Sequence, residues 1–320
     1  MKRILVTGAS GFVGAFLARS FIEAGHEVHL LLRSEQIPWR LESVRQDVRI
    51  HVASLFEPAE LDTLFGRVSP EWVFHLAAYG AYSTQRDDAR IIQTNASGTR
   101  NLLDAAWRAG VGAFINTGSS SEYGYCETAP SETELPHPNS VYAYSKAAAT
   151  LYATYLAEHH AMPVSTVRLY SVYGPYEEPT RFIPRLLMRA IDGGFPPLVE
   201  PSVARDFVYV GDVARAYDAI ARSDKRAAIY NVGSGVQTTI GEAVEVVRTQ
   251  FGISDMPVWG SMGNRSWDTG TWVANISRIS SKIGWVPQVD FRDGCRKMTE
   301  WLLSEPAIAA FYRAEHALPI

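Results

Sequence analysis

The sequence predicts an α/β fold: a Rossmann-like, doubly wound parallel sheet with a smaller C-terminal lobe. In the first third of the chain, short β-branched runs bounded by turn residues alternate with segments whose apolar residues recur at i, i+3 and i+4. Strand, helix and strand repeated in this order give a parallel sheet covered by helices on both faces. The second half is less regular, because Pro/Gly-rich stretches at 174–180 and 193–201 interrupt its helical patterns and indicate loops leading into another lobe.

Each expected element is a short segment with one dominant period. Strands are expected at 4–6, 28–32, 48–53, 72–76, 113–117 and 164–169. Helices are expected at 12–24, 91–108, 141–158, 182–192, 210–222, 240–251 and 291–304, with a final packing helix in the tail at 309–320. Ser140 is a candidate cap for the helix that begins at residue 141.

Composition limits the classes of function. The chain has 320 residues, of which 47% are hydrophobic and 20% charged, enough for one large unit or two lobes. A formal charge of -4 and the lack of a Lys/Arg run argue against nucleic acid as a partner. The first apolar run stops at Thr7, too early for a signal sequence, and no run is long enough to cross a membrane. Cys126 and Cys295 have no metal-ligand spacing, so we expect a cytoplasmic protein without a metal site.

A glycine-rich turn comes directly after the first expected strand. It reads TGASGFVG and opens a helical pattern, with its glycines three residues apart. Backbone N–H groups and the helix dipole at such a turn face an anion, and glycine permits the close approach of a pyrophosphate. We therefore expect a dinucleotide here. Its expected contacts at this turn are Gly8, Ser10, Gly11, Phe12, Val13 and Gly14.

The end of the second expected strand bears on which dinucleotide binds. Dinucleotide sites usually place an acid there to bind the ribose 2′-hydroxyl, whereas a nearby Arg accommodates a 2′-phosphate. This strand ends in LLLRS, with Leu32 where the acid is expected and Arg33 next. The sequence therefore predicts NADP(H) over NAD(H), the alternative being that Arg33 is a solvated loop residue.

Tyr142 and Lys146 lie four residues apart at the start of a helical pattern, so their side chains share one face. A tyrosine with the ordinary pKa of about 10 is a poor base at neutral pH. A neighbouring ammonium and a positively charged nicotinamide ring both favour its phenolate, and the pair then becomes a general acid/base for a carbinol or carbonyl oxygen.

Several motifs in sequence order resemble an extended short-chain dehydrogenase/reductase of the nucleotide-sugar epimerase/dehydratase group. They are TGASGFVG, HLAA at 75–78, NASGTRNLL from Asn95, SSSEYG, YAYSK and RDFVYVGDVA from Arg205. The resemblance runs from Met1 to about Pro287. It implies a dinucleotide-binding domain at 1–168 plus 206–232, and a lobe at 169–205 plus 233–320 that holds a nucleotide diphosphate sugar.

The resemblance also implies the roles of individual residues. Ser119, Tyr142 and Lys146 would form the catalytic set, with Ser120 or Ser121 as alternatives for the hydroxyl. Further cofactor contacts would come from Ser54, Leu55, Leu76, Ala77, Ala78 and Asn95. Substrate contacts would come from Tyr79, Ser83, Ser120, Ser121, Ser171, Arg205 and Arg265. The two arginines also have a physical basis, because an arginine fork binds phosphate oxygens bidentately.

The residues next to the catalytic hydroxyl bear on the type of reaction. Dehydratases of the family carry an acidic pair there, whereas this chain has Ser120 and Ser121, and a serine cannot deprotonate a sugar carbon at neutral pH. We therefore rank a 4,6-dehydratase third. Leu32 and Arg33, together with a serine run ending in EYG that resembles that of reductases of nucleotide 4-keto-6-deoxysugars, favour an NADP(H)-dependent reductase of such a sugar, with an NAD-dependent 4-epimerase as the alternative. A non-catalytic dinucleotide sensor is the rival from another class, but such proteins typically lose the tyrosine or the lysine.

A homodimer is expected through the helices at 91–108 and 141–158.

Overall fold

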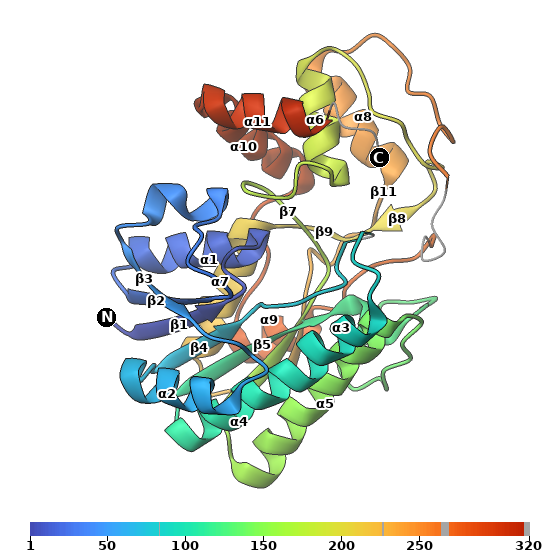
Figure 1. Cartoon of the computed structure of the whole chain (residues 1–320). Helices are drawn as coiled ribbons and strands as arrows, with labels where there is room; N and C mark the ends of the chain where they lie inside the picture. The colour runs from blue at the N-terminus through green and yellow to red at the C-terminus, as the bar shows by residue number, and fades with distance from the viewer. Residues whose placement is uncertain (83, 226, 264–268, 317–320) are drawn as a thin grey trace.

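The chain folds around a seven-stranded parallel sheet, seen in the lower part of Figure 1. The computed structural model describes residues 1–82, 84–225, 227–263 and 269–316. The strand order is β10-β6-β5-β4-β1-β2-β3, and every pairing in the sheet is parallel. The strands are β1 Arg3–Thr7, β2 Glu27–Leu32, β3 Val48–Val52, β4 Trp72–His75, β5 Ala113–Ser119, β6 Val164–Leu169 and β10 Ile229–Val232. This arrangement confirms the predicted Rossmann-like fold.

Helices cover both faces of the sheet (Figure 1). Along β5, Ile115 enters one apolar core and Phe114 the other, which is why the strand sequences are apolar almost throughout. The first core includes residues of α1 Phe12–Glu23, α7 Val210–Arg222 and α9 Ser277–Ile283. The second includes residues of α2 Pro58–Val68, α4 Thr99–Ala109 and α5 Val141–His160.

A smaller lobe lies beyond the carboxyl ends of the strands, at the top of Figure 1. Its helices share a separate apolar core; they are α6 Phe182–Ile191, α8 Ile240–Phe251, α10 Phe291–Ser304 and α11 Pro306–His316. Two short ladders accompany them: β7 Ser171–Tyr173 with β9 Phe207–Tyr209, and β8 Ala204–Arg205 with β11 Thr238–Thr239. The smaller lobe therefore faces the sheet edge at which parallel α/β sheets bind their ligands.

The helix expected at 91–108 is not continuous. It consists of α3 Asp88–Ile92, a π-helical segment η2 Gln93–Gly98, and α4. The NASG run contains poor helix formers, and the Asn95 side chain is held by tertiary hydrogen bonds that favour the wider turn. Single π-helical turns of this kind are frequent at functional sites. The 3-10 helices η1 Trp39–Val44 and η3 Ser120–Tyr123, together with α2, α9 and β10, were not among the expected elements.

Candidate active site

The glycine turn lies at the point where the strand order reverses, between β1 and β4. Gly8 has φ +72°, and a Cβ there would lie 2.4 Å from the Ala77 nitrogen, so this glycine packs against the loop that comes after β4. A Cβ on Gly14 would lie 2.4 Å from the Gly8 oxygen. Gly11 differs, because the nearest atom to its Cβ, the Gly8 oxygen, would be 3.3 Å away. Of the three glycines, the middle one has the least crowded Cβ position, which leaves this part of the turn the most open to a ligand.

The first turn of α1 has donors for an anion. Gly11 caps this helix without a side-chain hydrogen bond, so the N–H groups of the first turn are left for a ligand. Ser10 is exposed beside the turn, Phe12 is buried and Val13 is half-buried. These residues fit the pyrophosphate of a dinucleotide, as the sequence predicts.

The ends of β2 and β3 provide further predicted cofactor residues. Leu32 is buried and Arg33 is exposed. Ser54 accepts a hydrogen bond from the Phe56 nitrogen at 3.1 Å, so its hydroxyl proton remains available to a ligand. The Leu55 oxygen accepts from the Asn101 amide at 2.9 Å, which fixes the turn after β3.

After β4, the backbone of Leu76 and Ala77 is fixed by Thr7. The Thr7 carbonyl oxygen accepts a hydrogen bond from the Leu76 nitrogen. The Thr7 hydroxyl oxygen accepts one from the Ala77 nitrogen at 3.3 Å. Thr7 also contacts His75, whose Nδ1 lies 2.7 Å from the Thr7 hydroxyl. Burial lowers the pKa of His75 to about 3, so the imidazole is neutral and its role is to pack the strand end. Ala78 is exposed just beyond these residues.

Asn95 holds the next part of the same loop. Its Oδ1 accepts from the Tyr79 nitrogen at 2.9 Å, and its Nδ2 donates to the Tyr79 oxygen at 2.7 Å and to the Ser145 hydroxyl at 3.0 Å. Asn95 is completely buried. It therefore links the loop after β4 to α5, the helix that carries Tyr142 and Lys146.

Ser119, Tyr142 and Lys146 come together at the sheet edge. Ser119 is the last residue of β5, while Tyr142 and Lys146 lie in the first two turns of α5, whose first residue comes directly after the cap Ser140. The Ser119 side chain lies close enough to the Tyr142 hydroxyl to lower the pKa of that phenol. Lys146 is 4% exposed, so its amine is held inside the protein. The predicted catalytic residues thus form one constellation.

Burial shifts the proton affinities of Tyr142 and Lys146. It raises the pKa of Tyr142 to about 12, and the Ser119 side chain only partly opposes this effect. Burial also lowers the pKa of Lys146 to about 8. Without the charge of a nicotinamide ring, Tyr142 is therefore a neutral phenol at neutral pH. A neutral phenol is suited to donating a proton.

The residues after Ser119 carry no carboxylate free to act on a sugar. Ser120 is buried, Ser121 is half-buried, and the Ser121 nitrogen donates to the Ser119 hydroxyl at 3.1 Å. Glu122 is the nearest acid in the sequence, but its two carboxylate oxygens are bound by the Ser119 nitrogen at 2.8 Å and by Nε of Arg168 at 2.9 Å.

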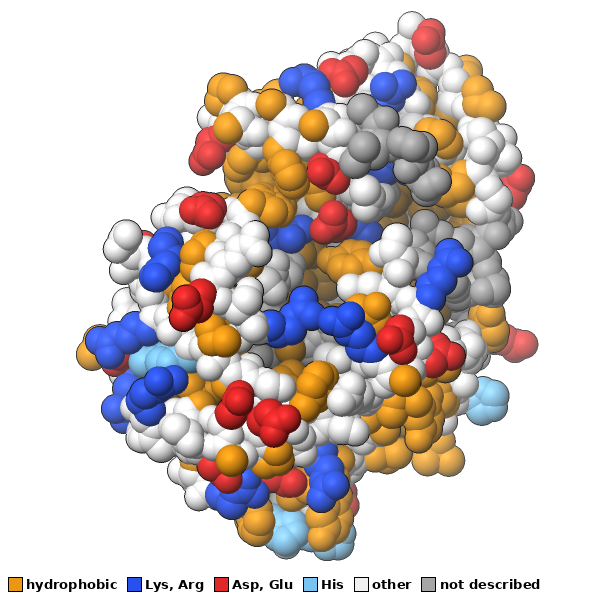
Figure 2. Space-filling view, viewed as in Figure 1, with side chains coloured by type: hydrophobic (Ala, Val, Ile, Leu, Met, Phe, Trp, Pro, Cys, Tyr) orange, Lys and Arg blue, Asp and Glu red, His pale blue; other side chains and the backbone are white. Residues whose placement is uncertain are grey.

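The predicted substrate residues of the smaller lobe are only partly described. The Ser171 nitrogen donates to the Asp206 carbonyl oxygen at 2.9 Å, and Ser171 begins β7. Arg205 lies over the Trp272 ring, 6.0 Å from its centroid. Ser83 and Arg265 lie outside the described residues. Figure 2 shows a hollow between the two lobes, with basic side chains along its lower edge.

A contact between the lobes was not predicted from the sequence. The Arg40 guanidinium donates to the Tyr176 oxygen at 2.7 Å and to the Glu178 carboxylate at 3.0 Å, and its NH1 lies 3.5 Å from the Ser10 oxygen. Arg40 therefore joins the glycine turn to the loop between β7 and α6. No local pattern marks this residue, because its two partners in that loop are 136 and 138 residues away in the chain.

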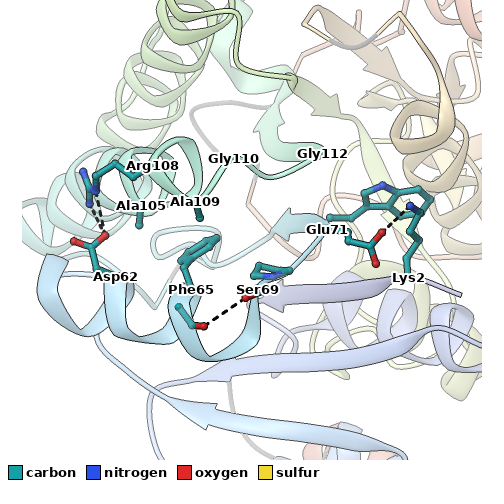
Figure 3. A pocket seen from close by; sticks show the side chains of 13 residues that line it. Lys2, Asp62, Phe65, Ser69, Glu71, Ala105, Arg108, Ala109, Gly110 and Gly112 are labelled. Atoms are coloured by element: carbon teal, nitrogen blue, oxygen red, sulfur yellow. Dashed lines mark hydrogen bonds and ion pairs between the residues drawn. The ribbon is translucent and has the colours of Figure 1, made fainter.

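Another concavity, of about 760 Å³, opens at the opposite edge of the sheet (Figure 3). Its charged side chains are paired: Lys2 with Glu71 and Arg108 with Asp62, each at 2.7 Å. It contains none of the predicted site residues.

Within the described part of the chain, no three His, Cys, Asp or Glu side chains form a group that could hold a metal ion. None of the described helices is long and apolar enough to cross a membrane.

Comparisons with known proteins agree with this geometry. The chain is 30% identical over 315 residues to a dTDP-glucose 4,6-dehydratase from Streptomyces griseus, covering 93% of each chain. The structure of a UDP-glucose 4-epimerase from Thermotoga maritima matches with a TM-score of 0.84 and 27% identity, over 93% of this chain and 98% of that one. DesIV, a dTDP-glucose 4,6-dehydratase from Streptomyces venezuelae solved with NAD, matches with a TM-score of 0.85 and 25% identity, over 95% and 98% of the two chains. Residues 4–233 match the NAD dependent epimerase/dehydratase family, and the chain is a member of that family.

Proposed function

We propose that the chain is a nucleotide-sugar oxidoreductase that transfers one hydride and one proton at a single sugar carbon without eliminating water. The observation that carries this proposal is the site itself, in which Ser119, Tyr142 and Lys146 are assembled while Ser120 and Ser121 come next in place of carboxylates. Elimination of water needs an acid and a base beside the neighbouring carbons. The one acid in the SSSEYG segment, Glu122, has both oxygens occupied.

The proposed direction is reduction of a nucleoside diphosphate 4-keto-6-deoxysugar. When bound, NADPH supplies the hydride. Ser119 would hydrogen-bond the ketone oxygen, and Tyr142, a neutral phenol at neutral pH, would give that oxygen its proton. The Lys146 ammonium would stabilise the phenolate that forms.

The preference for NADP(H) is proposed from the end of β2. Arg33 is exposed where a 2′-phosphate would lie, and the buried Leu32 offers no carboxylate to a 2′-hydroxyl. The nucleotide sugar is proposed to bind in residues 169–205 and 233–320, with Ser171 and Arg205 among its contacts. Tyr79 is proposed as a further contact from the loop after β4. Ser83 and Arg265 are proposed as further contacts from the sequence alone.

A 4-epimerase is the second candidate. Its support is the similarity to the UDP-glucose 4-epimerase from Thermotoga maritima and to DesIV, which was solved with NAD. An epimerase uses the same three catalytic residues, but its nicotinamide is oxidised and reduced within one turnover. Arg40 would favour a dinucleotide that stays bound between turnovers. It contacts the loop between β7 and α6 and lies beside the Ser10 oxygen, and these contacts would restrict the exchange of a bound dinucleotide.

We also propose a homodimer formed through α4 and α5. Large apolar side chains are exposed on these helices: Trp107 at 43%, Tyr144 at 54%, Leu151 at 60% and Tyr155 at 47%. Figure 2 shows hydrophobic side chains gathered beside α5 at the lower right of the molecule. An exposed apolar surface of this kind is typical of an interface between subunits.

One pair of assays distinguishes the two candidates. A reductase consumes one NADPH for each nucleotide 4-ketosugar reduced, and an epimerase interconverts nucleotide hexoses without net consumption of cofactor. In either case Tyr142→Phe should lower kcat by at least about 100-fold, the usual contribution of a general acid, while dinucleotide binding is retained. Conversion of a nucleotide hexose into its 4-keto-6-deoxy derivative would refute both candidates.

A further inference from the structure

Glu122 is a buried acid whose two oxygens join the catalytic strand to β6. Oε1 accepts from the Ser119 nitrogen at 2.8 Å, and Oε2 accepts from Nε of Arg168 at 2.9 Å. The side chains of Glu122 and Arg168 are 0% and 1% exposed. A Cβ on Gly118 would lie 2.5 Å from Glu122 Oε1, so the carboxylate folds back against the end of the strand. The Arg168 guanidinium in turn lies 4.4 Å from the centroid of the Tyr123 ring.

The contact to Ser119 constrains the catalytic hydroxyl. Ser119 and Glu122 form a capping box at η3, in which the Ser121 nitrogen donates to the Ser119 hydroxyl oxygen at 3.1 Å. One lone pair of that oxygen is thereby occupied, and the Ser119 backbone nitrogen is tied to the Glu122 carboxylate. The hydroxyl proton is left to be donated toward Tyr142 or a substrate oxygen.

The Glu122 charge also acts on both groups that exchange protons. It raises the pKa of Tyr142. Arg181 lowers the same pKa, and Tyr82 raises it by less than Glu122 does. It likewise raises the pKa of Lys146, opposing the larger effect of burial. His75 faces Lys146 from β4, but it is neutral because burial lowers its pKa to about 3.

From this geometry we infer that Glu122 is a positioning residue of the active site: held by Arg168, its carboxylate orients the Ser119 hydroxyl. It also places one buried negative charge in η3, which packs against α5, the helix that carries Tyr142 and Lys146. The inference rests on the proposed function only for the roles of the three catalytic residues. It assigns a role to the residue at which the serine run ends, a position that the proposed chemistry itself does not use.

The test is a titration of Lys146 in the full chain as purified, measured by carbon-13 NMR of labelled lysine side chains. The chain has five lysines, and the loss of one signal in Lys146→Arg assigns the signal of Lys146. In the wild type the amine should titrate at about pH 8. In Glu122→Gln it should titrate lower, by on the order of one unit, because the opposite charge has been removed. No sugar is needed, so the result is independent of which substrate the enzyme uses.

Glu132→Gln is the matched control. Glu132 is also a buried acid, accepting from the Asn231 nitrogen at 2.9 Å and pairing with Arg278 at 3.6 Å, but it is not among the groups that shift the pKa of Tyr142 or Lys146. Its variant should leave the Lys146 titration unchanged. If Glu122→Gln does not fold, because Arg168 is left buried without a counter-charge, the double variant with Arg168→Gln removes both charges and should shift Lys146 in the same direction.

Glu122→Asp separates charge from position. It keeps the carboxylate, so Lys146 should titrate as in the wild type, but the shorter side chain loses the Ser119 nitrogen and turnover should fall about tenfold or more. An unchanged Lys146 titration in folded Glu122→Gln, or the same shift in Glu132→Gln, would overturn the electrostatic role. Wild-type turnover by Glu122→Asp would overturn the positioning role.

Discussion

Two alanine substitutions in the glycine turn should separate folding from cofactor binding. In Gly8→Ala, the new Cβ would lie 2.4 Å from the Ala77 nitrogen, and φ is +72°, a region that L-residues rarely adopt. The backbone conformation alone costs about 1 to 2 kcal/mol. Overpacking against the loop after β4 adds about 1 to 3 kcal/mol, and each kcal/mol lowers the Tm of a domain of 150 to 250 residues by about 2 to 4 °C. Gly8→Ala should therefore lower Tm by roughly 5 °C or more.

Gly11→Ala should have the opposite profile. Its φ of -84° suits any residue, but the new Cβ would lie 3.3 Å from the Gly8 oxygen, a tight contact that a small shift relieves, so Tm without cofactor should fall clearly less than in Gly8→Ala, by about 2 °C or less. The methyl group would occupy the space left for the pyrophosphate, and the dinucleotide Kd should rise at least about tenfold, or 1.4 kcal/mol.

The assays are thermal unfolding monitored by circular dichroism and dinucleotide binding by calorimetry. Wild-type affinity in folded Gly11→Ala would refute the assignment of this turn as the pyrophosphate site. An unchanged Tm in Gly8→Ala would show that the packing of Gly8 against Ala77 is not needed for stability.

Three further substitutions test separate features. Arg33→Ser should weaken NADP(H) binding about tenfold and leave NAD(H) binding unchanged, and equal losses for both cofactors in calorimetry would argue against a 2′-phosphate contact. Leu151→Glu places a charge on the exposed apolar surface of α5 and should convert a dimer into a monomer in analytical ultracentrifugation; an unchanged mass would place the interface elsewhere. His75 has its pKa lowered to about 3, so the unfolded chain binds a proton that the folded chain does not, and stability should fall as pH drops from about 6.5 toward 3. His75→Gln should make the free energy of unfolding less dependent on pH in that window, and denaturant titrations with an unchanged pH slope would contradict this.

Much of the fold can be predicted from local patterns in the sequence. The alternation of β-branched runs and amphipathic helices identifies the parallel sheet, and the residues that end β1, β4 and β5 meet at one edge because parallel strands share their direction. Tyr142 and Lys146 could be predicted from their spacing at a helix start, whereas Ser119 was predicted from the family resemblance.

The features that were not predicted depend on contacts distant in sequence. The π-helical turn at η2 is stabilised by Asn95, whose partners Tyr79 and Ser145 are 16 and 50 residues away. Arg40 likewise has its partners in another lobe. The neutral state of Tyr142 was also not predicted, because spacing shows that Lys146 is near but does not show how strongly burial penalises the phenolate.

Transfer of one hydride and one proton at a single sugar carbon can be measured directly by running the reaction in D2O with nucleotide hexoses and their 4-keto-6-deoxy derivatives. Proton exchange by Tyr142 at an oxygen places no solvent deuterium on carbon, so NMR of the sugar product should show carbon-bound deuterium at no position. Solvent deuterium on a ring or methyl carbon would show that a carbon is deprotonated or reprotonated during turnover, and would contradict oxidoreduction without elimination.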